Sequence, residues 1–219
     1  MPSIKAEPLL LSALLLAGSL PLLGGCAPAV VVGTAYGATV VHERRSAQTI
    51  VDDEWIELQG KTLYYQNRDI DRQSRMTITS YNHVALLTGQ ADNAEVSQRY
   101  AQMISQLPKV RKVFNEVSIG PRISLAQEST DALITSRAKI AIGGGRGIED
   151  FDATRIKVVT EDGVIYLMGL VTPEEADVTA DVVRRLPGVK RVVKMFEYVQ
   201  PKQQPRSVPS DPERTSSPI

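Results

Sequence analysis

The sequence is poor in the residues that build disulfides, metal centres and acid–base sites. Cys26 is the only cysteine in 219 residues, so the chain cannot close an internal disulfide or assemble a cysteine-rich metal site. His42 and His83 are the only histidines, and no nucleophile-and-base pairing is visible near either of them. We therefore expect no metal, no cofactor and no catalytic residue, and predict that the protein is not an enzyme.

An excess of charge of either sign is also missing. The chain carries 25 basic and 25 acidic residues, whereas a dedicated nucleic-acid binder shows a basic excess, so no nucleic-acid partner is expected. Aromatic residues make up only 5% of the chain, and we expect cores built from valine, isoleucine, leucine and alanine. The glycine-rich segment GGGRG at residues 143–147 lacks the Lys-Ser/Thr pair of a phosphate-binding loop, which argues against a nucleotide site.

The N-terminus indicates export and lipidation. Residues 8–25 are uncharged and largely apolar, and the glycines and proline near the end of this run favour a signal peptide over residues 1–25 rather than a spanning helix. The tetrapeptide LGGC at residues 23–26 resembles the lipobox of bacterial lipoproteins. This resemblance implies that Cys26 becomes the first mature residue and carries acyl chains such as palmitate, and Ala27 after it favours the outer membrane. The alternative is an ordinary secretory signal with a coincidental cysteine.

The segments on either side of the predicted folded region, residues 26–45 and 201–219, show no clear pattern of secondary structure. Residues 27–45 are mostly small and apolar, and the uncharged run at 30–41 is too short to span a bilayer. We interpret residues 26–45 as a lipidated tether; a short strand or helix is the alternative. Residues 201–219 are rich in proline and poor in apolar residues, which predicts a disordered tail.

An internal repeat between these flanks decides the architecture. The segment that starts at Asn82 matches the one that starts at Asp162: Gly89 aligns with Gly169, and the Leu-Pro pair at 107–108 aligns with that at 186–187. The repeat predicts two small domains of one fold, which we place at residues 46–120 (the first repeat) and 126–200 (the second repeat).

Each repeat is predicted to contain helix, strand, strand, helix and strand. A turn at residues 81–83 joins the first two strands of the first repeat, and the Asp-Gly pair at 162–163 is a strong hairpin signal in the second. Asp92 and Thr172 are expected to cap the second helices, with Pro173 at the first helical position. The predicted fold class is α+β, with two tandem domains that each place two helices on one face of a three-stranded mixed sheet. In the first helix of the first repeat, Val51, Trp55, Leu58 and Thr62 are expected to share one face.

The segment VTEDGVIYLMGLVTPEEADVTADVVRRLPGVKRV in the second repeat resembles a BON domain. With the lipobox and the first repeat, the chain resembles the dual-BON outer-membrane lipoproteins. The resemblance implies a lipid-anchored protein of the outer membrane that faces the periplasm. It also implies that the second domain binds anionic phospholipid such as phosphatidylglycerol, and that the protein maintains envelope integrity at the division site.

In that family the first helix of the second domain meets the bilayer. Carried over to this chain, the lipid-binding residues are Leu133, Ile134, Arg137 and Lys139, which combine apolar insertion with positive charge. The alternative for this helix is a solvated face with Ile134 in the core. Two departures bear on the strength of binding: Leu133 replaces the tryptophan of a family member, and the loop at 143–151 is longer.

Two further interpretations concern protein partners. The pair of domains can act as a docking platform for envelope proteins, either as a periplasmic adaptor or as an accessory of a secretion apparatus. Trp55, the only tryptophan, is expected to pack in the core of the first repeat rather than against a partner.

Overall fold

The computed structural model of the protein describes residues 43–144 and 151–200. The predicted signal peptide, Cys26, the predicted tether up to residue 42 and the predicted tail lie outside the described residues, as does most of the loop at 143–151.

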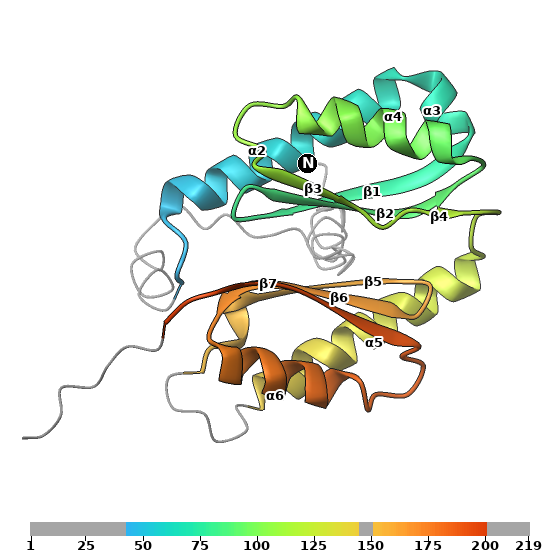
Figure 1. The fold of residues 1–219 in the computed structure, drawn as a ribbon. Helices are drawn as coiled ribbons and strands as arrows, with labels where there is room; N and C mark the ends of the chain where they lie inside the picture. The colour runs from blue at the N-terminus through green and yellow to red at the C-terminus, as the bar shows by residue number, and fades with distance from the viewer. Residues whose placement is uncertain (1–42, 145–150, 201–219) are drawn as a thin grey trace, which may run out of the picture. The chain divides into compact units, whose positions relative to one another are not determined.

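The first repeat places two long helices on one face of a mixed sheet (Figure 1). Strand β2 is antiparallel to β1 and parallel to both β3 and β4, so the third strand of the prediction is present in two pieces. The elements in chain order are α2 (Ala47–Gln66), α3 (Arg68–Arg72), β1 (Ser74–Tyr81), β2 (Val84–Ala91), α4 (Ala94–Ser105), β3 (Lys112–Asn115) and β4 (Ser118–Ile119).

The second repeat has the same layout (Figure 1). Strand β6 is central, antiparallel to β5 and parallel to β7, and both long helices cover one face of the sheet. The elements are α5 (Leu125–Gly143), the 3₁₀ turn η2 (Ala153–Arg155), β5 (Ile156–Glu161), β6 (Val164–Val171), α6 (Pro173–Val183) and β7 (Arg191–Tyr198). The predicted α+β fold with two tandem repeats is therefore confirmed.

Both predicted hairpin turns are present. Asn82 and His83 have φ values of 52° and 65°, and Asp162 and Gly163 have 46° and 73°. A two-residue turn with both central residues in the left-handed region matches the twist of the flanking strands. Asparagine, aspartate and glycine tolerate this region best, which is why the sequence marks three of these four positions.

The predicted helix caps are right in the second repeat and shifted in the first. Thr172 accepts the backbone N–H of Glu175, whose side chain accepts the N–H of Thr172 in return, and Pro173 is the first helical residue. In the first repeat the cap is Asn93 rather than Asp92. The backbone N–H of Asp92 instead donates to the carbonyl of Gln73, so Asp92 still extends the hairpin.

The four residues expected to share a face of α2 do so, but that face is not the one turned toward the sheet. Val51 and Leu58 are exposed, while the helix turns Asp53, Ile56 and Gly60 inward. A Cβ atom on Gly60 would lie 2.6 Å from Cδ1 of Ile78, so the missing side chain lets α2 sit close to the sheet. Trp55 is partly buried against the first core, in agreement with the packing role expected for it.

Each repeat has its own core between its helices and its sheet, and a third cluster forms on the opposite sheet faces. The first core contains Ile56, Ile78, Leu87, Tyr100 and Ile104. The second contains Ile134, Ile165, Leu167 and Val183. The third joins the faces turned away from the helices: Tyr81, Val84 and Leu86 of the first repeat with Tyr166 and Met168 of the second.

Candidate membrane-contact surface

The orientation of α5 is set by a buried aspartate. The side chain of Asp131 accepts the backbone N–H of Asp162 at 2.7 Å and that of Gly163 at 2.9 Å. Gln127, one turn earlier, donates to the same carboxylate at 3.0 Å. A carboxylate that accepts both N–H groups of a hairpin tip fixes the helix against the sheet in one rotation about its axis.

That rotation decides which residues of α5 reach the core. Ile134, Ala138 and Ile142 follow Asp131 at helical spacing and lie in the second core. Ile134 is only 1% exposed, and its side chain packs beside Gly188. Its place among the predicted lipid-contacting residues is therefore corrected, because the side chain cannot reach a bilayer without leaving the core.

The opposite face of α5 is apolar. Leu125, Leu133 and Ile140 are 80%, 56% and 77% exposed, although each is a large aliphatic side chain. With Ser129 and Ser136 they form one outward stripe, since positions 125, 129, 133, 136 and 140 recur at helical spacing. We call these five residues the α5 stripe. Leu133 is one of the lipid-binding residues predicted from the sequence, whereas Leu125 and Ile140 were not among them.

The hydroxyl groups on this side of α5 are satisfied within the helix. Ser129 Oγ donates to the carbonyl of Leu125, and Ser136 Oγ donates to that of Ala132, both at 2.9 Å. Thr130 does the same with Ala126. A hydroxyl that bonds back to the fourth preceding carbonyl needs no partner from solvent, so the cost of moving this face into an apolar medium is lowered.

Positive charge flanks the stripe. Arg137 and Lys139 are exposed, and neither forms an ion pair with any residue in the described part of the chain. At about 100° per residue they fall on opposite sides of the stripe. Glu128, an acidic residue of the same helix, is bound by Nε of Arg75 at 2.9 Å. The face thus combines exposed aliphatic residues with two available cations.

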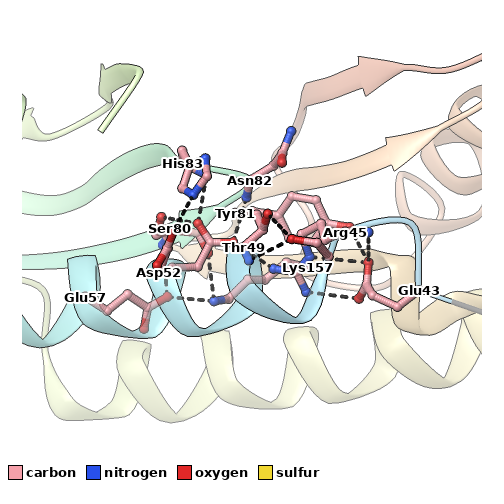
Figure 2. A network of polar contacts seen from close by, with 12 residues as sticks. Glu43, Arg45, Thr49, Asp52, Glu57, Ser80, Tyr81, Asn82, His83 and Lys157 are labelled. Atoms are coloured by element: carbon pink, nitrogen blue, oxygen red, sulfur yellow. Dashed lines mark hydrogen bonds and ion pairs between the residues drawn. The ribbon is translucent and has the colours of Figure 1, made fainter. Parts of the chain in front are cut away.

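The corresponding aspartate of α2, Asp53, lies in a denser polar network. Figure 2 labels several of its partners, among them Arg45, Ser80 and Asn82. Asp53 accepts the backbone N–H groups of Asn82 and His83 at 2.7 and 2.8 Å, and Ser80 Oγ donates to it. Arg45 forms an ion pair with Asp53 at 2.9 Å and stacks on the ring of Tyr81. Arg44 donates to Glu175 and to the carbonyl of Leu170, so residues 44 and 45, assigned to the tether in the sequence analysis, contact both repeats.

This network is structural in character. The hydrogen bond from Lys109, with those from Gln48 and His83, holds the pKa of Asp52 below its usual value although burial opposes ionisation. Burial raises the pKa of Tyr81 to about 12. Both shifts favour the protonation state that each group already has at neutral pH, whereas an acid–base catalyst needs a pKa near the working pH.

The described residues offer neither a cluster of metal ligands nor a helix that could span a membrane. No group of three or more histidine, cysteine, aspartate or glutamate side chains is placed to hold a metal ion there. Across residues 43–144 and 151–200, no helix combines the length and the apolar character needed to cross a bilayer.

The sequence is similar to a known domain family and to two known proteins over most of its length. The model of the BON domain family matches residues 52–121 and again residues 130–200. The chain is 33% identical over 185 residues to the outer membrane lipoprotein DolP of Haemophilus influenzae, covering 84% of this chain and 94% of that protein. It is also 33% identical over 156 residues to a 21 kDa hemolysin of Actinobacillus pleuropneumoniae, covering 71% and 79%.

The solved structures that align with this chain are only weakly similar to it. The chain aligns with CdsD, a structural protein of the type III secretion system of Chlamydia trachomatis, at 12% identity and a TM-score of 0.24. That alignment covers 64% of this chain and 94% of the other. A likeness this weak supports neither the fold nor the secretion-accessory interpretation.

Proposed function

Because this chain belongs to the BON-domain family, as a dual-BON protein of the DolP type, we propose that it is a non-enzymatic outer-membrane lipoprotein that binds anionic phospholipid through the α5 stripe. Cys26 carries the acyl anchor, and the folded repeats face the periplasm. In this proposal the protein maintains envelope integrity at the division site, as the family resemblance implies.

The observation that carries the proposal is the composition of the outward face of α5. Exposed Leu125, Leu133 and Ile140 offer apolar area to the acyl boundary, and Arg137 and Lys139 stand beside them at the depth of the headgroups. Basic residues near an anionic surface contribute about 1 kcal/mol each, so two of them favour phosphatidylglycerol over a neutral lipid.

The adaptor interpretation is less well supported in its original form. That interpretation places a partner on the sheet face or at Trp55. The faces turned away from the helices are buried in the third cluster, where Leu86 and Met168 are 0% and 1% exposed, and Trp55 is partly buried against the first core. A protein partner therefore has to use a helix face or a sheet edge.

Flotation on vesicles tests the proposal. The fragment 38–200 is used, because it lacks the acyl anchor but keeps the contacts of Arg44 and Arg45. We expect it to float with vesicles that contain phosphatidylglycerol and not with phosphatidylcholine alone, and to be released by high salt. Leu133→Asp and Ile140→Asp should each abolish flotation.

Ile119→Asp is the matched control. Ile119 is also a large exposed aliphatic residue, but it lies on β4 of the first repeat, so its substitution should leave flotation unchanged. Flotation that survives both α5 variants would contradict the proposed surface. If the wild-type fragment does not float on either lipid, the repeats have no membrane affinity of their own.

A further inference from the structure

Helix α2 has an apolar outward face that the phospholipid proposal does not use. Val51, Leu58 and Tyr65 are 61%, 60% and 68% exposed, and they lie seven residues apart. Trp55 and Thr62 lie between them and are partly buried. Thr62 donates its hydroxyl to the carbonyl of Leu58, so this hydroxyl needs no partner from solvent.

The spacing of these residues is that of a helix–helix seam. Positions 51, 55, 58, 62 and 65 alternate steps of four and three, which is the a/d pattern of a heptad repeat. The buried residues Ile56, Gly60 and Tyr64 lie on the opposite side of the helix. We call these five positions the seam. Its three exposed residues, Val51, Leu58 and Tyr65, point away from the body of the repeat, where a second helix can pack along them.

The seam is complementary to itself when reversed. In an antiparallel pair centred on Leu58, Val51 lies level with Tyr65 of the other copy, and Trp55 lies within one residue, about 1.5 Å along the axis, of Thr62. Glu54 and Lys61 flank the seam on one side, and the same reversal brings each glutamate within one residue of the lysine of the other copy. A two-fold interface needs this self-complementarity, and here it yields two opposite-charge pairs.

Both flanking charges are available for such pairs. Glu54 has no ion pair with any residue in the described ranges. Lys61 reaches Glu57 only at 3.8 Å, and Glu57 is held more closely by Lys157 at 2.6 Å. A parallel pair would leave both charges opposite Gln59 and Gln66, so the charge pattern favours the antiparallel arrangement.

The comparison with α5 argues against a bilayer as the occupant. The flanks of the α2 seam carry one acidic and one basic residue, whereas those of the α5 stripe carry Arg137 and Lys139. An anionic surface gains nothing from balanced charge, and two copies of α5 would repel each other. We propose that the outward face of α2 is the interface of an antiparallel homodimer, with Leu58 on the two-fold axis and two Glu54–Lys61 pairs between the copies.

The dimer is expected to be weak and dependent on concentration. The seam covers residues 51–65, or about 21 Å of helix between its ends, which places the interface at the small end of specific protein contacts. The proposal is independent of lipid binding by α5, which lies on the other repeat.

Charge reversal tests the arrangement in the full-length chain, purified in detergent and measured by sedimentation equilibrium. The wild type should pass from one to two chains per particle as its concentration rises. Glu54→Lys and Lys61→Glu should each weaken the dimer by roughly tenfold, because each variant creates two like-charge pairs. Combining both substitutions in one chain should restore the wild-type dissociation constant.

A mixture of the two single variants gives the sharpest outcome. Each variant alone repels its own kind, but the two together form two opposite-charge pairs, so the mixture should dimerise like the wild type. Arg99→Glu, an exposed charge reversal on α4, is the control and should leave the dimer unchanged. Circular dichroism confirms that each variant is folded. A wild type that stays monomeric, or a mixture no tighter than its components, would overturn the proposal.

A single introduced thiol tests the two-fold axis separately. In a Cys26→Ser background, Leu58→Cys should form a disulfide between copies, because the axis brings position 58 against itself. Val51→Cys should not, since the antiparallel arrangement separates the two copies of position 51 by about 21 Å along the helix. Equal cross-linking at both positions would indicate a parallel pair and would contradict the proposed geometry.

Discussion

Asp53 and Asp131 occupy equivalent places in the two repeats: each projects from the first helix and accepts both backbone N–H groups at the tip of the hairpin that follows. The distances are 2.7 and 2.8 Å for Asp53, and 2.7 and 2.9 Å for Asp131. This contact ties each first helix to its sheet and so determines which residues of α2 and α5 face outward.

Replacing that carboxylate should destabilise the repeat. Asp131→Asn keeps one acceptor oxygen for two N–H groups, so one buried donor loses its partner, and we expect a loss of about 1–3 kcal/mol in unfolding free energy. Urea denaturation measures it. Asp177→Asn changes an exposed aspartate on α6 and should cost less than about 0.5 kcal/mol. Equal losses in the two variants would contradict the anchoring role of Asp131.

Gly89 should tolerate no side chain. Its φ is +117°, and a Cβ atom there would lie 1.9 Å from the carbonyl oxygen of Arg75 on the neighbouring strand. Gly89→Ala should therefore cost about 3 kcal/mol or more, since backbone strain adds to the clash. Gly143→Ala is the control, because nothing lies within 4 Å of its added methyl and alanine favours a helix. Thermal unfolding of both variants checks this.

A tryptophan at position 133 should strengthen lipid binding. Leu133 is exposed on the α5 stripe, and the larger indole adds apolar area while its N–H stays at the headgroup level. We expect Leu133→Trp to gain roughly 1 kcal/mol, or about fivefold in the vesicle partition coefficient. Ile119→Trp, on the first repeat, should leave the coefficient unchanged; a gain of the same size there would mean that insertion is not specific to α5.

Acid should weaken the fold through Glu175. Burial opposes its ionisation, but the hydrogen bonds from Arg44 and from the backbone of Thr172, with the charges of Arg44 and Arg155, hold its pKa below the usual 4.5. A carboxyl group with a lowered pKa contributes stability that is complete above its unfolded pKa and is lost as the pH falls through the folded pKa. The melting temperature should therefore drop below about pH 4.5.

Glu175→Gln isolates this contribution. Glutamine can keep the capping contact with Thr172 but does not titrate, so the variant should lose less stability between neutral and acidic pH than the wild type. Glu174→Gln, on the exposed side of the same turn, should keep the wild-type pH profile. Melting temperatures that fall equally in all three proteins would contradict the role of Glu175.

Turns and helix starts could be predicted wherever a short run of residues is compatible with only one backbone conformation. The Asp-Gly pair at residues 162–163 indicates a two-residue turn, because both of its central residues need a left-handed backbone. The start of helix α6 is indicated by its capping residues, Thr172, Pro173 and Glu175. Asp92 and Asn93 are both good caps, and the choice between them depended on a hydrogen bond to the carbonyl of Gln73, which is distant in the sequence.

The rotation of the first helices was not predictable in the same way. Helix α2 carries two apolar stripes, and the larger residues of the outward one suggested the core. The inward stripe depends on Gly60 and on Asp53, whose buried roles come from partners on β1 and in the hairpin tip. In α5 the neighbours Leu133 and Ile134 cannot both face the lipid, and Ile140 lies just beyond the segment that the family resemblance covered.

The third cluster has a consequence for how the protein unfolds. Tyr81 and Leu86 of one repeat share a buried cluster with Tyr166 and Met168 of the other, and Tyr81 donates its hydroxyl to the carbonyl of Arg155. Either half made alone would expose an aromatic and aliphatic surface that the intact chain keeps from water. The duplicated halves are thus interdependent, and we expect cooperative melting in a single transition, with truncated halves prone to aggregate.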